Sequence, residues 1–133
     1  MDIYPSMKMV KKRTIISLIR SSNIVIIDHP HTSFIESLAI NAPSLFFWNP
    51  NIYKMRSEAE EYFDLLREVG VLYDKPLEAA KQLIQIYDHT LDWWNQKSIQ
   101  DARTVFLEIF GYSRKNWMEY WAKEIRKLGR NRN

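Results

Sequence analysis

The chain has 133 residues, of which 46% are hydrophobic and 26% charged, ordinary values for a single soluble globular domain. No apolar run approaches the ~20 residues that cross a bilayer, and residues 1–19 lack a signal-type apolar core, so we expect a cytoplasmic protein. Because cysteine is absent and the three histidines form no ligand pattern, neither disulfides nor a metal site is expected.

The net charge of +3 conceals a segregation of charge along the chain. Nine of the 19 basic residues lie within residues 8–13 and 123–132, whereas residues 14–122 hold 10 basic and 14 acidic residues, a net charge of −4. Solvated helix faces explain short basic runs best, and no nucleic-acid-binding motif accompanies them, so we expect no specific nucleic-acid partner. Peripheral contact of the basic ends with the inner face of a membrane stays open.

The first third of the chain predicts helix, strand, helix and strand. A helix is expected from Met9 to Ser22, followed by a strand at Ile24–Ile27, whose continuous β-branched run is typical of a strand covered on both faces. A helix at Ser33–Asn41, with Ile35, Leu38 and Ala39 on one face, leads past Pro43 to a second strand at Ser44–Phe47. We expect the two strands to be parallel neighbours joined by a right-handed crossover.

Helices dominate the remainder. The sequence predicts a helix at Ser57–Val69 that Gly70 ends, at most a short strand at Val71–Tyr73, and a helix that Asp74 caps and Pro76 opens. The helix that Pro76 opens would bury Leu77, Ala80, Ile84 and Tyr87. Two more helices start near Ser98, with Ile99, Ala102, Phe106 and Ile109 aligned, and near Ser113, with Trp117, Tyr120, Trp121, Ile125 and Leu128 aligned. We expect Trp93, Trp94, Trp117 and Trp121 to pack in the core.

Two or three parallel strands are too few for a complete doubly wound sheet, which has about five or six. We therefore predict one incomplete α/β domain over residues 1–133, a partial Rossmann-like domain with a small parallel sheet. Its open sheet edge needs a partner, either a missing part of a larger protein or a second copy of the chain.

The polar segment between Asp28 and Glu36 follows the first strand, where open parallel sheets bind ligands. Ser33 and Glu36 form the S-x-x-E pattern of a capping box, which explains both residues structurally. In the functional interpretation, the backbone N–H groups of Thr32, Ser33 and Phe34 hold a phosphate and Glu36 accepts hydrogen bonds from a ribose.

Further side chains near this turn have both structural and functional explanations. Asp28 ends the strand and could satisfy turn N–H groups or bind a ligand. His31 could donate to a phosphate or act as an acid or base, and Arg56 could reach an anion, although the sequence favours an exposed surface position for both. A Gly-rich phosphate loop is absent from the sequence.

The run IVIIDHPHTSFIESLAINAPSLFFWNP resembles the nucleotide-sugar-binding C-terminal domain of GT-B glycosyltransferases, Kdo transferases and CDP-glycerol glycerophosphotransferases. With YKMRSEAEEYFDLLREVGVLYDKPLEAAKQL, the resemblance extends over residues 20–122 to bacterial transferases of surface carbohydrate synthesis. The resemblance implies that Thr32 and Ser33 bind the donor diphosphate and Glu36 its ribose. It also implies a nucleotide-activated donor as substrate, without metal or cofactor.

The resemblance is to one half of a two-domain enzyme. The N-terminal domain, which supplies the acceptor site, has no room in 133 residues, so we expect the isolated chain to be inactive. The leading hypothesis is the donor-binding portion of a glycosyltransferase or glycerophosphotransferase. The alternative is a non-catalytic interaction module that associates through its sheet edge, and a basic nucleic-acid binder ranks third.

Overall fold

The computed structural model describes residues 7–111 and 115–130, which form an α/β fold around a three-stranded parallel sheet. The strands are β1 (Val25–Ile27), β2 (Ser44–Phe47) and β3 (Leu72–Tyr73), in the order β1-β2-β3. β1 and β2 are parallel neighbours, with Val25 opposite Ser44 and Ile27 opposite Phe46. The predicted positions, direction and adjacency of the first two strands are confirmed, and so is the short third strand.

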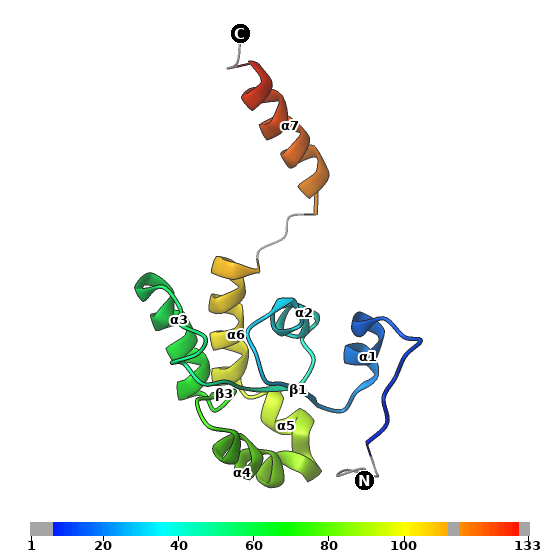
Figure 1. The fold of residues 1–133 in the computed structure, drawn as a ribbon, viewed down its shortest axis with the longest axis vertical. Helices are drawn as coiled ribbons and strands as arrows, with labels where there is room; N and C mark the ends of the chain where they lie inside the picture. Colours follow the sequence, from blue (N-terminus) through cyan, green and yellow to red (C-terminus); the bar gives the residue numbers. More distant parts are fainter. Residues whose placement is uncertain (1–6, 112–114, 131–133) are drawn as a thin grey trace.

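Helices cover both sides of this sheet (Figure 1). α2 (Thr32–Ile40), α3 (Ser57–Glu68) and α6 (Lys97–Phe110) lie on one side, and α4 (Pro76–Ile86) and α5 (Thr90–Trp94) lie on the other. α1 (Ile15–Ser21) packs beside α2, the 3-10 turn η1 (Tyr87–His89) joins α4 to α5, and α7 (Trp117–Arg130) lies apart. The first helix is shorter than predicted because Thr14 caps it, its hydroxyl accepting a hydrogen bond from the N–H of Ser17.

The core between the sheet and the α2 side is aromatic. Phe34 in α2 makes edge-to-face contacts with Phe46 of β2, Trp48 and Phe106 of α6, at centroid separations of 4.7, 5.3 and 5.4 Å. Phe63 of α3 completes the cluster, and all five side chains are buried. Because each ring pair adds about 0.5–1.5 kcal/mol beyond its burial, this cluster fixes α2 against β2 and α6.

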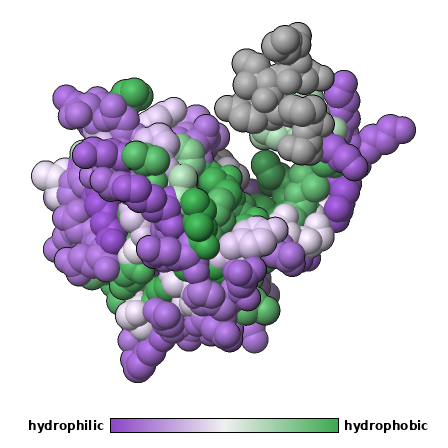
Figure 2. Space-filling model, turned by 90° about the horizontal axis from the view of Figure 1, so that it is seen from below, coloured by the Kyte–Doolittle hydropathy of each residue, from purple (hydrophilic) through white to green (hydrophobic). Residues whose placement is uncertain are grey.

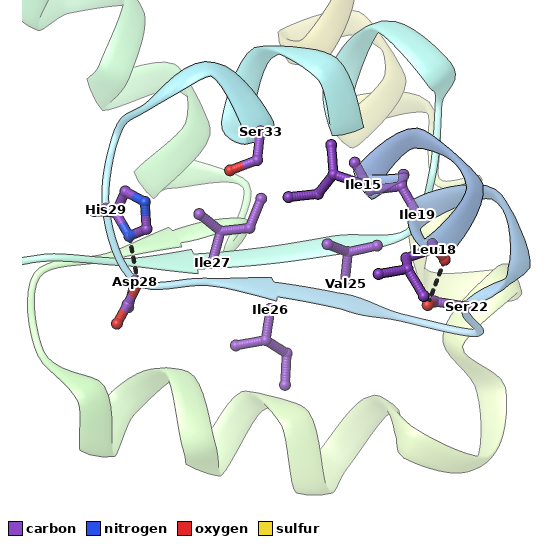
Figure 3. Close-up of a pocket in the computed structure, with 10 residues that line it drawn as sticks. All are labelled: Ile15, Leu18, Ile19, Ser22, Val25, Ile26, Ile27, Asp28, His29 and Ser33. Carbon is purple, nitrogen blue, oxygen red and sulfur yellow. Dashed lines mark hydrogen bonds and ion pairs between the residues drawn. The ribbon is translucent and has the colours of Figure 1, made fainter. Parts of the chain in front are cut away.

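The expectation that β1 is covered on both faces is wrong. Val25 and Ile27 point toward α2, but Ile26 points to the opposite side, where its side chain is 49% exposed (Figure 3). Ile26 is exposed because β1 is one of the two edge strands of the sheet, and α4 packs on the other two strands, β2 and β3.

The predicted inward face of α4 is also wrong. Ala79 and Ile86 are buried, whereas Leu77, Ile84 and Tyr87 are exposed. The helix is apolar on two stripes, so periodicity alone could not show which stripe contacts the sheet. Figure 2 shows hydrophobic side chains gathered in the middle of the face seen from below, the side on which α4 and α5 lie in Figure 1.

The tryptophans divide into two groups. Trp93 and Trp94 of α5 are buried as predicted, but Trp117 and Trp121 of α7 are 53% and 59% exposed, which contradicts the predicted core role. The pattern of α7 is that of an amphipathic helix, but its apolar stripe faces solvent. The predicted start of this helix at Ser113 lies outside the described residues. Over residues 7–111 and 115–130, no helix is both long and apolar enough to cross a membrane.

Candidate functional site

A hollow of about 240 Å³ lies between α1 and the edge strand β1. Its walls are apolar, formed by side chains that include Ile15, Ile19 and Val25, and its end at the carboxyl terminus of β1 is polar (Figure 3). There Asp28, His29 and Ser33 line it. The structure therefore places part of the predicted polar cluster at the position where open parallel sheets bind ligands.

The N-terminus of α2 differs from the predicted capping box. The N-cap is His31, not Ser33, and its side chain makes no capping hydrogen bond. His31 is the last residue in an extended conformation, with φ −100° and ψ −170°, so the helix begins at Thr32 and Ser33 already lies in its first turn. The S-x-x-E pattern is present in the sequence, but Ser33 lies two positions after the N-cap, so Ser33 and Glu36 cannot form the reciprocal hydrogen bonds of a capping box.

Because α2 starts at Thr32, some backbone N–H groups of its first turn have no hydrogen-bond partner. The N–H of Phe34 donates to the carbonyl oxygen of His31 at 3.0 Å, which removes it from the predicted set of three free amides. Within the described part of the chain, the N–H groups of Thr32 and Ser33 donate no hydrogen bond. Two amides at the positive end of a nine-residue helix therefore remain available to an anion.

Glu36 lies one turn into α2. Its side chain is half-buried and makes no hydrogen bond or ion pair with any described residue. It does not line the hollow beside β1, so the ribose role predicted for it places a ligand near the N-terminus of α2 and outside that hollow. An unpaired carboxylate is free to accept hydrogen bonds from a ligand.

The histidines form a small polar group with Asp28. Nδ1 of His29 lies 2.5 Å from Oδ1 of Asp28, so Asp28 pairs with its neighbour. The ring of His29 stands edge-on to that of His31 at 4.5 Å, and His31 in turn stands edge-on to Tyr53 at 6.3 Å. His31 is exposed beside the free amides, a place from which it can reach the same ligand.

Arg56 is not brought to this cluster. It is the exposed N-cap of α3 and lines a separate, shallow hollow with Tyr62, Ile109 and Phe110. No residue between Asp28 and Glu36 lines that hollow. A contact of Arg56 with an anion at α2 therefore receives no support from the geometry.

The C-terminus of α2 is held by residues that the sequence interpretation missed. Asn41 adopts the left-handed conformation at φ 60°, and the N–H of Ala42 donates back to Ser37 at 3.1 Å, the pattern of a Schellman motif. Nε1 of Trp94 donates to Oδ1 of Asn41 at 2.8 Å, and Nε of Arg103 donates to the carbonyl oxygen of Leu38 at 2.7 Å. An asparagine after a helix is a recognisable stop signal, but nothing local in the sequence indicates the contacts from Trp94 and Arg103.

Arg67 of α3 has a structural role and lies outside the polar cluster at α2. Arg67 of α3 contacts the carboxylates of Glu60, Asp64 and Asp74, the last at 2.9 Å. Burial alone would lower the pKa of Arg67, but its hydrogen bonds to Asp74 and Asp64 outweigh this and raise it. Asp74 thus ties α3 to the segment before α4, and the N-cap of α4 is Lys75, contrary to the prediction that Asp74 caps that helix.

No group of three or more histidine and acidic side chains within residues 7–111 and 115–130 is arranged to hold a metal ion.

The model of one protein family, described as LIC12162 family transferase, matches residues 1–125 of the chain. Searches of curated proteins and of solved structures gave no significant match.

Proposed function

We propose, because the chain belongs to the LIC12162 family of transferases, that it binds the diphosphate of an activated donor at the N-terminus of α2. The observation that carries the proposal is the pair of unpartnered N–H groups of Thr32 and Ser33. They belong to a helix of nine residues without a side-chain cap, at the carboxyl end of a parallel strand. An anion bound there would take the place of the missing cap.

Electrostatics favour this position. The aligned peptide dipoles put roughly half a positive charge at the N-terminus of α2, and Arg103 and the Schellman motif hold its other end in place. A donor diphosphate becomes more negative as the bond to the transferred group breaks. Fixed amides directed at it would stabilise the leaving diphosphate without a metal ion.

The unpaired carboxylate of Glu36 supports a nucleoside as the rest of the donor. A ribose carries two vicinal hydroxyl groups, and a carboxylate without a protein partner can accept a hydrogen bond from each. The resemblance to donor-binding domains of GT-B glycosyltransferases and glycerophosphotransferases assigns the same roles to Ser33 and Glu36. The proposed substrate class is thus a nucleoside diphosphate carrying a sugar or glycerol phosphate unit, used in bacterial surface polysaccharide synthesis.

The acceptor site would come from another protein segment, which we expect to join along β1. This edge strand has only one sheet neighbour, and Ile26 on it remains half exposed. The same observation supports the second candidate function, a non-catalytic module that associates through this edge, either with a partner or with a second copy of the chain.

The N–H of Thr32 allows a direct test. Proline suits the first position of a helix, and the extended His31 before it is compatible with proline, so Thr32→Pro removes one donor and keeps the helix. Thr32→Val removes only the hydroxyl and serves as the matched control. We expect UDP, CDP or GDP, measured by titration calorimetry, to bind Thr32→Pro about tenfold more weakly than Thr32→Val, the loss of one charge-assisted hydrogen bond.

Two outcomes would contradict the proposal. Equal nucleotide affinity of the two variants would show that the N–H of Thr32 at the start of α2 does not bind the nucleotide. If none of the nucleotides binds the wild-type chain and the chain forms dimers that a charge at Ile26 disrupts, the interaction module is the correct function.

A further inference from the structure

Helix α7 carries an apolar face that no other described element covers. Successive residues of a helix are 100° apart, so this face collects residues spaced three and four apart. Its large side chains are all more than half exposed: Trp117, Met118, Trp121, Ile125 and Leu128. In Figure 1 the helix lies away from the sheet and its covering helices.

The opposite face of α7 is basic. Lys123, Arg126 and Lys127 lie on it, and Lys115 and Arg130 flank it in the sequence, against two acidic residues, Glu119 and Glu124. Glu124 is neutralised locally, since its carboxylate lies 2.6 Å from Nζ of Lys127. The part of the chain between residues 14 and 122, by contrast, has a net charge of −4. Lys123 and Arg126 are exposed and form no ion pair with a described residue, so their charges are available to an external partner.

We propose that α7 binds the surface of an anionic lipid bilayer, lying in the interface with its apolar face toward the acyl chains. Tryptophan on the apolar face and lysine and arginine on the polar face are the combination that favours this position. Lysine and arginine beside the apolar face can extend to the lipid phosphates while their stems stay in the apolar layer. The helix has 14 residues, so it is about 21 Å long, too short to span the bilayer but long enough to lie on it.

A second copy of the chain explains α7 less well. Pairing two such helices through their apolar faces would leave the basic residues without anionic partners, and two heptads are marginal for a coiled coil. A lipid surface satisfies both faces of α7 at once. This proposal does not depend on the donor site, since α7 shares no residue with it.

The distribution of tryptophan provides the readout. Trp48, Trp93 and Trp94 are already buried, so a change in tryptophan emission on adding vesicles reports on Trp117 and Trp121. With the full chain, we expect a blue shift and protection from acrylamide with vesicles of phosphatidylcholine and phosphatidylglycerol. Vesicles of phosphatidylcholine alone should give little change. Raising the salt concentration should weaken the binding, because screening reduces attraction to the lipid surface.

Paired variants separate the two faces in a vesicle co-sedimentation assay. Lys123→Gln with Arg126→Gln should lower partitioning roughly 25-fold, about fivefold for each cation, and Trp117→Ser with Trp121→Ser should lower it more than about tenfold. Neither Lys123 nor Arg126 forms an ion pair within the described residues. Leu77→Ser with Ile84→Ser, exposed apolar residues of α4, is the matched control and should bind like the wild type.

Three outcomes would overturn the proposal: no binding to anionic vesicles, equal binding to neutral vesicles, or an equal loss in the α4 control. Sedimentation velocity without lipid tests the competing explanation. Dimers that the tryptophan double variant abolishes, together with no vesicle binding, would assign the apolar face of α7 to a second copy of the chain.

Discussion

Nε of Arg103 in α6 donates a 2.7 Å hydrogen bond to the carbonyl oxygen of Leu38 in the last turn of α2. The two residues are 65 positions apart, and the contact ties the C-terminal end of α2 to the helix that packs behind it. Burial lowers the pKa of Arg103, but the guanidinium still carries its charge at neutral pH. A positive charge here faces the negative end of the α2 dipole, so Arg103 stabilises the helix whose other end is the candidate anion site.

Replacing Arg103 with methionine should lower the free energy of unfolding by about 1–2 kcal/mol. The substitution keeps the apolar stem but removes a charged donor and its interaction with the helix dipole. Urea denaturation measures the change. Lys81→Met, at an exposed position of α4, is the control and should have less than a third of this effect. Equal effects at the two positions would mean that the hydrogen bond to Leu38 contributes no net stability.

Replacing Asn41 with glycine or with alanine should give variants of different stability. Its φ of 60° is strained for alanine and not for glycine, and both substitutions remove the Oδ1 that accepts from Trp94. We therefore expect Asn41→Ala to be less stable than Asn41→Gly by about 1 kcal/mol in thermal or urea unfolding. If the two variants are equally stable, the left-handed conformation of residue 41 is not maintained in solution.

The sheet was predictable because its signals are local. Four consecutive β-branched residues before Asp28, and a second short apolar run after Pro43, are too short for helices. The helical segment between them indicates a parallel crossover. An open sheet edge follows from the same count of strands, but the count does not show which strand forms it. The exposure of Ile26 could not be predicted from the local sequence, because it depends on where α4 packs, and tertiary contacts determine that packing.

At the candidate site, the residue types were predictable but their positions in the helix were not. Ser33 and Glu36 fit a capping box, yet His31 adopts the N-cap conformation and the helix starts earlier. Composition could not reveal this, because a histidine without a capping side-chain bond is an unusual N-cap. The roles of Arg103 and Trp94 were missed for a different reason: both reach α2 from positions more than 50 residues later in the chain.

The absence of a capping box makes Glu36 a clean probe of the proposed ribose contact. Since its carboxylate has no partner in the described structure, Glu36→Gln should leave the melting temperature unchanged. It should weaken binding of a nucleoside diphosphate by about 1.5–3 kcal/mol, roughly tenfold to over a hundredfold, through loss of charge-assisted hydrogen bonds. The corresponding deoxyribose nucleotide provides the control, since it should lose affinity in the wild type and little more in the variant. A drop in stability with unchanged affinity would instead assign Glu36 a structural role.

Substitution by phenylalanine should destabilise the fold at Trp94 and have little effect at Trp121. Trp94 is 1% exposed and donates through Nε1 to Asn41, so Trp94→Phe removes a hydrogen bond and part of a buried ring, and should cost about 2–3 kcal/mol of unfolding free energy. Trp121 is 59% exposed on α7, so Trp121→Phe should change stability by less than about 0.5 kcal/mol. The sequence assigns both residues to a core, Trp121 by its helical spacing from Trp117 and Trp94 as an aromatic residue, so the comparison tests that assignment against the observed packing. A large loss of stability for Trp121→Phe in the absence of lipid would show that α7 packs against the rest of the chain and is not available to a membrane.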